Sequence, residues 1–527
     1  MPTVLLALLI LLSGVCFAAD DKAEYSELWG KNGEKWNPSG RLPDFSYAGY
    51  RMGEVPIPSP AVKCSVKDFG AKGDGSTDDT KAFQDALKKT TGGAILIPAG
   101  KYVITDFLEI DKSNLVLRGE GPGKTALFFP KYLNDIKPNW GATTSGQKTS
   151  NYSWGGGYIV IKGSNGGKAL GKIAEPAKRG EHVIVLEKAC TLKKGDFIEI
   201  RQKDNPDNAM MKHLYCGQPG DMAKIPGSTR TSFVSRITAV EVAPAVRSTA
   251  GTEAGATTAG RDAGATPRTK VTLERALRSD VDPAWHAEGF EFAPRVVDSG
   301  VEELTFEFPP QLYKGHFTEL GHNPALISGA SHCWIRNVRV LNGESGPYLG
   351  GWFCTVSGIT LDSTCTPDKT GCVGHHGITL YGTDNLAEDF TFTCKYIHDL
   401  TVEHSAGNVF HRGKGVDMCF DHHKRAPHAN LFTNIDIGEG KRMYMCGGGA
   451  ALGKHSGAWE TFWNLRAKQP QKLWSPDFGP DMMNFVGVES REQPVLKPEG
   501  RWWEPISPAR LQPQDLYEAQ LMKRTKK

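Results

Sequence analysis

Histidines are concentrated in one short part of this chain. Eight of the fifteen are His375, His376, His398, His404, His411, His422, His423 and His428. Charged residues in the same segment include Arg412, Lys414, Lys424, Arg425, Asp417 and Asp421. Imidazole transfers protons near neutral pH, and cations beside it can hold an anionic substrate. We therefore interpret this segment as one wall of a catalytic site rather than as a solvated turn.

One reaction that uses such a set is β-elimination in a uronate-containing polysaccharide. The proton to be removed lies α to a carboxylate, so a cation must neutralise that group and stabilise the enolate-like transition state. Candidates for this cation are Arg412, Lys414, Lys424 and Arg425. Candidates for the base are His376, His404, His422 and His423. Asp421 can orient a histidine or ligate calcium, the one cofactor that we consider.

Three other interpretations of the segment stay open. A glycoside hydrolase needs two carboxyl groups, and Asp417 and Asp421 would share one face of a regular strand. A transition-metal centre could use His375, His376, His422, His423 and Asp421. Adjacent histidines on a strand point to opposite sides, so each pair should supply one ligand. In the third, structural interpretation, the histidines satisfy backbone groups at turns.

Aromatic and further polar residues could bind the sugar. Tyr348 and Trp352 are candidates for stacking on a sugar ring, although core packing explains either residue equally well. His375 and His428 are further candidates for contacts with the substrate.

The elements that must position these residues are short strands. A small polar residue or glycine followed by alternating apolar positions recurs in NLVL at 114, NVRV at 337, GITL at 358, DLTV at 399, NIDI at 434 and NLRA at 464. Such a repeat predicts stacked coils in which each covers the apolar face of the next. A β-sandwich would explain the strands but not the recurring Asn, Asp or Gly, so we favour a parallel β-helix. Segments such as HHGITL, IHDLTVEHS and GVDMCFDHH would then lie about 4.8 Å apart.

A helix is predicted before the first strands. Ala82, Phe83, Ala86 and Leu87 form one apolar face, Ser76 or Thr77 can cap its start, and Gly92-Gly93 should stop it.

The stretch from position 66 to 127 resembles the N-terminal signature of the pectate-lyase-like superfamily. The matching residues are Asp68-Phe69-Gly70-Ala71, Gly73-Asp74-Gly75, Thr77-Asp78-Asp79-Thr80, Ala82-Phe83-Gln84, Ala86, and Ile97-Pro98-Ala99-Gly100 with Tyr102. The resemblance, also to rhamnogalacturonase- and epimerase-like proteins, implies an all-β, right-handed parallel β-helix with a short N-terminal capping helix and long loop insertions. It transfers no catalytic residue. The Asn-Thr-Asp, Gly-His-Gly and Arg-Ile-Lys elements of polygalacturonases are missing, which favours a polysaccharide lyase over a hydrolase.

The chain has 527 residues and a formal net charge of +3, which does not fit a nucleic-acid-binding protein. Residues 1–18 resemble a secretory signal peptide, so we expect a secreted, periplasmic or cell-surface protein without membrane insertion. We predict an extended arm over 19–60, a β-helix over 61–490 with a flexible insertion at about 243–268, and a tail over 491–527. Export permits disulfides, for example between Cys365 and Cys372.

The sequence therefore predicts a monomeric, exported enzyme that cleaves an acidic polysaccharide, most simply by β-elimination. A hydrolase and a non-catalytic glycan-binding or adhesion solenoid are the alternatives.

Overall fold

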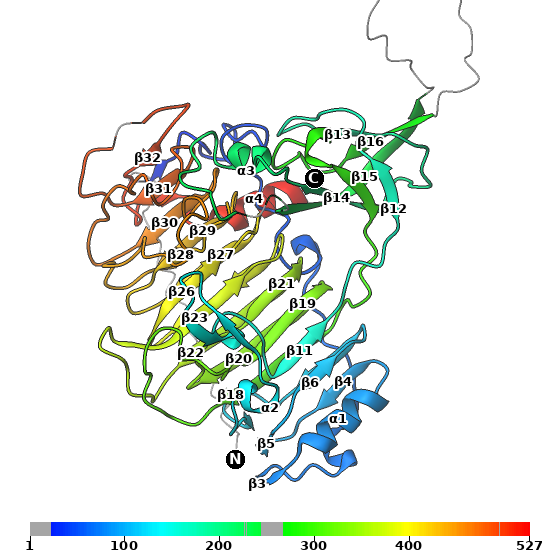
Figure 1. Ribbon diagram of the computed structural model, residues 1–527, viewed down its shortest axis with the longest axis vertical. Coiled ribbons are helices and arrows are strands. Elements are labelled where there is room, and N and C mark those ends of the chain that lie inside the picture. Colours follow the sequence, from blue (N-terminus) through cyan, green and yellow to red (C-terminus); the bar gives the residue numbers. More distant parts are fainter. Residues whose placement is uncertain (1–22, 226, 228, 244–266, 495, 527) are drawn as a thin grey trace, which may run out of the picture.

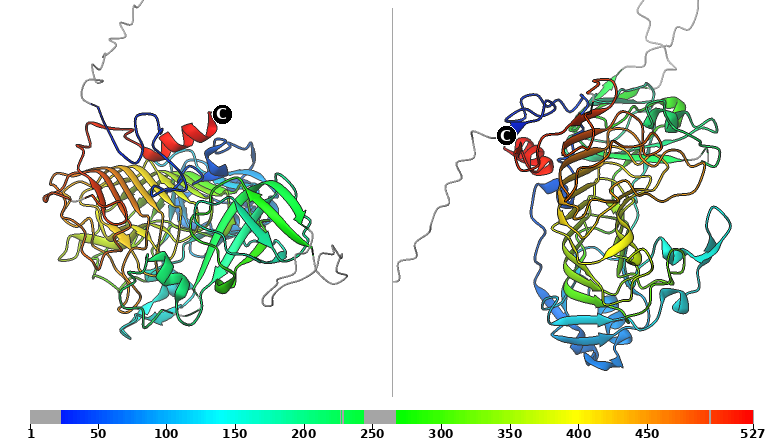
Figure 2. Two further views of the ribbon diagram at one scale, coloured as in Figure 1. Left: turned by 90° about the horizontal axis from the view of Figure 1, so that it is seen from above. Right: turned by 90° about the vertical axis from the view of Figure 1, so that its left-hand side faces the viewer.

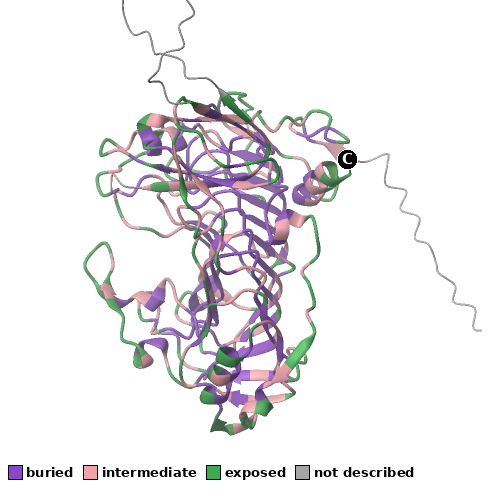
Figure 3. Ribbon diagram, turned by 90° about the vertical axis from the view of Figure 1, so that its right-hand side faces the viewer, coloured by how far each residue is buried: buried purple, intermediate pink, exposed green. Residues whose placement is uncertain are grey.

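The computed structural model describes residues 23–225, 227, 229–243, 267–494 and 496–526. The residues predicted to form a signal peptide and nearly all of the predicted flexible insertion lie outside the described part of the chain. The chain folds as a right-handed parallel β-helix, as predicted, whose coils are stacked along the long axis of the molecule (Figures 1 and 2). Buried residues run along the stacked strands, and exposed residues lie mainly in the loops and at the ends (Figure 3).

Two parallel sheets form the walls of the β-helix. The smaller sheet has seven strands, in the order β28 (Phe420–His422), β26 (Lys395–Val402), β23 (Cys372–Leu380), β21 (Tyr348–Trp352), β19 (Ala325–Ser331), β11 (Ile159–Lys162) and β6 (Leu108–Ile110). The larger sheet has sixteen strands: β2 (Val62–Ser65), β3 (Asp74–Asp78), β4 (Gly93–Leu96), β5 (Gly100–Val103), β7 (Leu115–Arg118), β8 (Thr125–Phe128), β18 (Gly300–Glu307), β20 (Trp334–Leu341), β22 (Thr355–Asp362), β24 (Leu386–Glu388), β25 (Thr391–Phe392), β27 (Val409–Lys414), β29 (Leu431–Asp436), β30 (Thr461–Arg466), β31 (Asn484–Val488) and β32 (Trp502–Glu504).

The recurring Asn and Gly residues mark bends in strands of the larger sheet. Asn337, Asn434 and Asn464 have φ of 48°, 54° and 52°, and Gly358 has φ of 65°. The register of β18 with β20 skips at Asn337, since Glu302 faces Arg336 and Leu304 faces Val338. Asn and Gly tolerate this left-handed conformation better than other residues do. The repeat in the sequence is therefore a repeated bend of the coil.

The interior of the C-terminal coils contains a column of stacked rings. The centroids of Phe410 and Phe432 lie 5.1 Å apart, those of Phe432 and Phe462 lie 5.3 Å apart, and those of Phe462 and Phe485 lie 4.4 Å apart. The spacing is close to that of neighbouring strands, because each ring comes from the equivalent position of its coil.

Helix α1 (Thr80–Lys89) lies at the N-terminal end of the stack (Figure 1). The predicted face formed by Ala82, Phe83, Ala86 and Leu87 is buried in the main hydrophobic core. The prediction for the helix start is wrong: the N-cap residue is Asp79, and the proposed caps lie in β3. A loop between β8 and β11 contains helix α2 (Leu133–Ile136) and an antiparallel pair of strands, β9 (Trp140–Ala142) and β10 (Lys148–Ser150).

An antiparallel sheet with its own core interrupts the β-helix, and the sequence did not suggest it. Its strands are β12 (Ala169–Lys172), β13 (Val183–Leu186), β14 (Phe197–Lys203), β15 (Arg230–Ala243), β16 (Arg268–Leu273) and β17 (Glu288–Glu291), with helix α3 (Ala209–Leu214). It is tied to the coils by a buried ion-pair group in which Arg275 and Arg278 both bind Asp384. The insertion is therefore anchored by charge as well as by packing.

The two ends of the described chain lie on the same side of the β-helix (Figure 2). Strand β1 (Glu24–Tyr25) pairs with β33 (Leu511–Gln512), and helix α4 (Leu516–Thr525) packs beside the N-terminal arm. Short 3-10 helices η2 (Tyr50–Gly53), η3 (Val66–Phe69), η4 (Asn151–Ser153) and η5 (Pro283–Trp285) lie in connections. Among the described residues, no helix has the length and apolar character needed to cross a bilayer.

All ten cysteines among the described residues are free thiols. Cys365 and Cys372 are both buried, and the disulfide that we considered between them is not formed in the structure.

Candidate functional site

Three strands of the smaller sheet carry the histidine-rich segments side by side. Strand β23 pairs with β26 in a register that places His376 opposite His398, and β26 pairs with β28 with Thr401 opposite Asp421. The predicted stacking of these three coils is therefore confirmed, and Figure 1 shows the strands as neighbours.

Their side chains form a compact group of imidazoles. The ring centroids of His375 and His376 lie 4.1 Å apart, those of His376 and His398 lie 5.1 Å apart, and those of His398 and His423 lie 5.5 Å apart. The first three of these side chains are buried. Neighbouring coils thus bring together residues that are almost fifty positions apart in the sequence.

Two adjacent pairs of histidines behave differently. The His422 ring packs against Phe432 in the core, whereas His423, the residue directly after β28, joins the cluster, so this pair supplies one member as expected. His375 and His376 both belong to the cluster, so that prediction is wrong for this pair. A register shift between Cys372 and Gly374 in β23 precedes the pair, and a strand that is irregular there does not keep strict alternation.

A loop between β18 and β19 adds a histidine that sequence reasoning missed. His316 Nε2 lies 2.8 Å from His375 Nε2, and the His316 ring stacks on Phe317 with centroids 3.7 Å apart. From the same loop, Glu319 places a buried carboxylate oxygen 3.6 Å from His375 Nδ1 and accepts a hydrogen bond from Tyr313. His316 lies outside the dense segment, almost sixty positions before His375, so nothing in the sequence linked it to the cluster.

Asp421 holds the other side of the cluster. Its carboxylate accepts a hydrogen bond from the backbone N–H of Gly447 (2.6 Å), lies 2.8 Å from His423 Nδ1 and lies 3.6 Å from His398 Nδ1. A Cβ atom at position 447 would lie 2.8 Å from His398 Nε2 and 2.6 Å from His423 Cε1. Glycine at this position therefore lets the loop approach the imidazoles closely.

Burial and the Asp421 carboxylate shift the pKa values of the clustered histidines in opposite directions. Burial lowers the pKa of His398 to about 3 and that of His316 to about 4, and it holds the pKa of His375 well below the usual value. Burial acts in the same direction on His423, but the Asp421 carboxylate outweighs it and raises the pKa of His423 to about 9. Near neutral pH the imidazole of His398 is therefore uncharged and that of His423 is protonated, although their ring centroids lie only 5.5 Å apart.

A large pocket opens beside the cluster, and His316 forms part of its wall. Its volume is about 1090 Å³. Five cations, Lys314, Lys369, Lys395, Lys441 and Arg442, line it together with only two carboxylates, those of Asp368 and Asp417. Among the described residues, Lys314 and Lys369 form no ion pair, so their charges are available to a ligand. The pocket is suited to an anion.

Several predicted site residues lie elsewhere. His422 points into the core, where its ring lies 5.3 Å from that of Phe432 and its Nε2 lies 3.5 Å from a Glu460 carboxylate oxygen. Its predicted roles as a base and as a metal ligand are therefore wrong. His404 Nδ1 lies 3.1 Å from the backbone oxygen of Arg425, and His428 Nδ1 lies 3.0 Å from that of Ala426. These two contacts match the structural interpretation of histidines at turns.

Two of the cations predicted to neutralise a substrate also lie away from the histidine cluster. Arg412 and Lys414 lie on β27 of the larger sheet. Arg412 is bound by Glu388, Asp389 and Glu518 beside α4, so its predicted role in the cluster is wrong.

The remaining charged candidates lie around the end of β28. Lys424 packs against Gly448, and Arg425 Nη1 lies 3.9 Å from a Glu403 oxygen. Asp417 lines the pocket and accepts a hydrogen bond of 2.8 Å from the backbone N–H of Lys441. Asp417 and Asp421 thus have separate hydrogen-bond partners, and only Asp417 lines the pocket.

The two aromatic candidates lie outside the cationic pocket. Tyr348 is fully buried and donates a hydrogen bond to Ser345. Trp352 lies at the end of β21 with its Nε1 3.2 Å from Ser232 Oγ and its ring against Phe292 of the inserted sheet. Burial therefore contradicts the stacking role of Tyr348, and neither aromatic residue lines the cationic pocket.

The cluster does not suit calcium. Calcium takes six to eight oxygen ligands, whereas imidazole nitrogen dominates here. Among the described residues, His316, His375 and His398 each place a ligand atom within 4.8 Å of the others, as do His398, Asp421 and His423. Imidazole ligands are typical of zinc and other transition metals.

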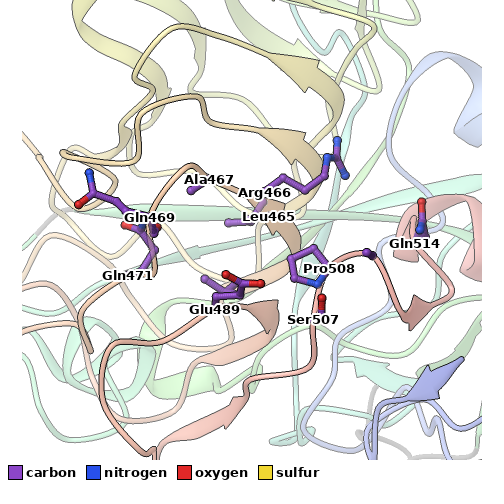
Figure 4. A pocket seen from close by; sticks show the side chains of 11 residues that line it. Leu465, Arg466, Ala467, Gln469, Gln471, Glu489, Ser507, Pro508 and Gln514 are labelled. Atoms are coloured by element: carbon purple, nitrogen blue, oxygen red, sulfur yellow. The ribbon is translucent and has the colours of Figure 1, made fainter. Parts of the chain in front are cut away.

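A second pocket lies at the C-terminal end of the coils (Figure 4). It encloses about 230 Å³ between β30, β31 and the segment before α4, and its lining includes Arg466, Gln471, Glu489 and Pro508. Its lining residues include no histidine, so we place no proton-transfer chemistry there.

Comparison with known proteins supports the resemblance seen in the sequence. Residues 64–152 match the family described as rhamnogalacturonase A/epimerase, pectate lyase-like, which confirms the N-terminal resemblance. Alginate lyase 7 of Azotobacter vinelandii is 38% identical over 100 residues, which cover 17% of this chain and 12% of that protein. Mannuronan C5-epimerase AlgE3 of the same organism is 35% identical over 97 residues, covering 17% and 5%. The chain thus matches only a small part of each relative.

Among solved structures, the tailspike gp61 of Pseudomonas phage phi297 has a TM-score of 0.45 and 11% identity, over 81% of this chain and 67% of that one. The A-module of mannuronan C-5 epimerase AlgE4 from Azotobacter vinelandii has a TM-score of 0.30 and 13% identity, over 81% and 76%. The histidine cluster and the cationic pocket lie outside the segment matched by the family.

Proposed function

We propose that this protein is an exported enzyme that cleaves a uronate-containing polysaccharide by β-elimination. The observation that carries the proposal is the cationic pocket beside the buried imidazole cluster. Lys314 and Lys369 provide unpaired positive charge, which attracts the carboxylates of a polyuronate. The similarity of a short segment to an alginate lyase supports this choice of polymer class.

In the reaction, the C–H bond α to the carboxylate breaks and its electron pair forms a carbon–carbon double bond. The glycosidic C–O bond breaks as this double bond forms, and the leaving oxygen takes a proton. We assign to His423 the proton that the leaving oxygen takes, because Asp421 favours its protonated form and binds its Nδ1, which leaves Nε2 for the substrate. The proton from carbon passes to a neutral imidazole of the same cluster. The His423 side chain is 23% exposed, whereas that of Asp421 is fully buried, so Asp421 positions the imidazole without touching the sugar.

Incubation of the full chain with a panel of polyuronates tests the proposal. Elimination leaves an unsaturated, ultraviolet-absorbing end for each bond that is cleaved. Replacement His423→Gln should lower kcat by about 10²–10⁴-fold with little change in KM, which is the range for loss of a general acid or base. The matched control is His182→Ala, because His182 is an exposed histidine of the inserted sheet.

Other products would contradict elimination in recognisable ways. New reducing ends without ultraviolet absorbance would indicate a hydrolase. Retention of a polyuronate without any turnover would indicate a glycan-binding solenoid. If His423→Gln retained wild-type kcat, the assignment of His423 would be wrong even if elimination were observed.

A further inference from the structure

The imidazole cluster leaves many buried polar atoms without partners. Among the described residues these include His375 Nδ1, His376 Nε2, both ring nitrogens of His398 and one carboxylate oxygen of Glu319. A buried polar atom without a hydrogen bond has lost its hydration without compensation, so a fold that gathers several of them in one place is expected to bind something there.

Two of the residues with unpartnered atoms, His375 and His398, belong to a group that could hold a metal ion. His316, His375 and His398 each offer a ring nitrogen within 4.8 Å of the other two. They come from a loop, from β23 and from β26, and the Nε2 atoms of His316 and His375 already lie 2.8 Å apart. Two neutral imidazoles can share only one hydrogen bond, whereas one cation can accept a lone pair from all three.

Two of these imidazoles have a carboxylate near the ring nitrogen Nδ1. Glu319 faces Nδ1 of His375 at 3.6 Å, and Asp421 faces Nδ1 of His398 at the same distance. A carboxylate in this place fixes the orientation of a metal-binding imidazole and makes the ring more basic. In His375 this leaves Nε2, the atom beside His316, directed at the shared position.

We propose that His316, His375 and His398 bind one divalent transition-metal ion, for which zinc is the best fit, with Glu319 and Asp421 as positioning residues. Three imidazoles leave a zinc ion with an open position, as in catalytic zinc sites. His316 belongs to the pocket wall, so the ion would lie beside the pocket, where its open position could take a ligand. If the proposed elimination is correct, a carboxylate oxygen of the polyuronate occupies that position; this last step rests on the proposed function.

The metal site is tested without substrate. The full chain is stripped with a chelator, and zinc binding is measured by equilibrium dialysis with elemental analysis. Cobalt(II) is then titrated, and its visible absorption reports the coordination geometry. We expect one equivalent of zinc and a tetrahedral cobalt spectrum. Glu319→Gln should weaken binding by about 10–100-fold, the usual effect of losing a carboxylate behind a ligand. His316→Ala should weaken it more.

His316 is the most informative replacement, because it lies on a loop and is only partly buried, so the variant should still fold. The control His182→Ala should bind zinc as the wild type does. Failure of the wild type to bind stoichiometric zinc, or unchanged binding by His316→Ala, would refute the site. If the protein binds zinc but forms no unsaturated product from polyuronates, the metal site is supported and the proposed elimination is refuted.

Discussion

The protonation of His411 should control how firmly the C-terminal helix is attached. His411 is fully buried; its Nδ1 lies 3.0 Å from Asp515 and its Nε2 lies 3.1 Å from Glu388. Burial alone lowers the pKa of His411, and the positive charge of Arg412 acts in the same direction. The two carboxylates outweigh both effects and raise the pKa from 6.5 to about 8. The ring of Tyr517 covers the remaining side at 4.9 Å.

The sign and size of the effect follow from this shift. Because the pKa of His411 is higher in the folded chain than in the unfolded one, its contribution to stability is fully present below pH 6.5. The contribution is lost as the pH rises through about 8. A difference of about 1.5 pKa units corresponds to about 2 kcal/mol in the free energy of unfolding.

Urea denaturation at about pH 6 and about pH 9 measures this loss, with hydrogen exchange following the amides of α4. His411→Gln is the matched control, because a neutral amide cannot titrate and other groups contribute equally to both proteins. The wild type should lose about 2 kcal/mol more than His411→Gln between the two pH values. An equal loss in both proteins, or a wild type that gains stability at the higher pH, would refute the reasoning.

Three further replacements test other parts of the structure. Asp384→Ala leaves two buried arginines unpaired, so it should lower the free energy of unfolding by about 3–5 kcal/mol in chemical denaturation; a loss below about 1 kcal/mol would contradict the anchoring role. Lys369→Ala removes an unpaired charge from the pocket and should raise KM for a polyuronate by about fivefold at low salt, and an effect that persists unchanged at high salt would argue against an electrostatic origin. Gly447→Ala places a Cβ against His398 and His423 and should abolish product formation while leaving thermal unfolding of the coils nearly unchanged; wild-type turnover would show that the loop is not held close to the cluster.

Part of the fold was predictable because it depends on local rules. Asn337, Asn434 and Asn464 recur because the coil bends at a position with positive φ, and few residue types accept that conformation. The apolar face of α1 was readable from its helical spacing. The inserted antiparallel sheet was not recognised, since its strands alternate in the same way as those of the coils.

The sequence by itself determined the parallel β-helix and the clustering of histidines on neighbouring coils, because one coil follows another in chain order. It could not determine which face each imidazole takes: His422 enters the core, while His375 and His376 both join the cluster after an irregularity in β23. Only the tertiary structure brought His316 and the lysines of distant loops to that cluster. Contacts between loops depend on the paths of whole segments through space, and such paths leave no periodic pattern in the sequence.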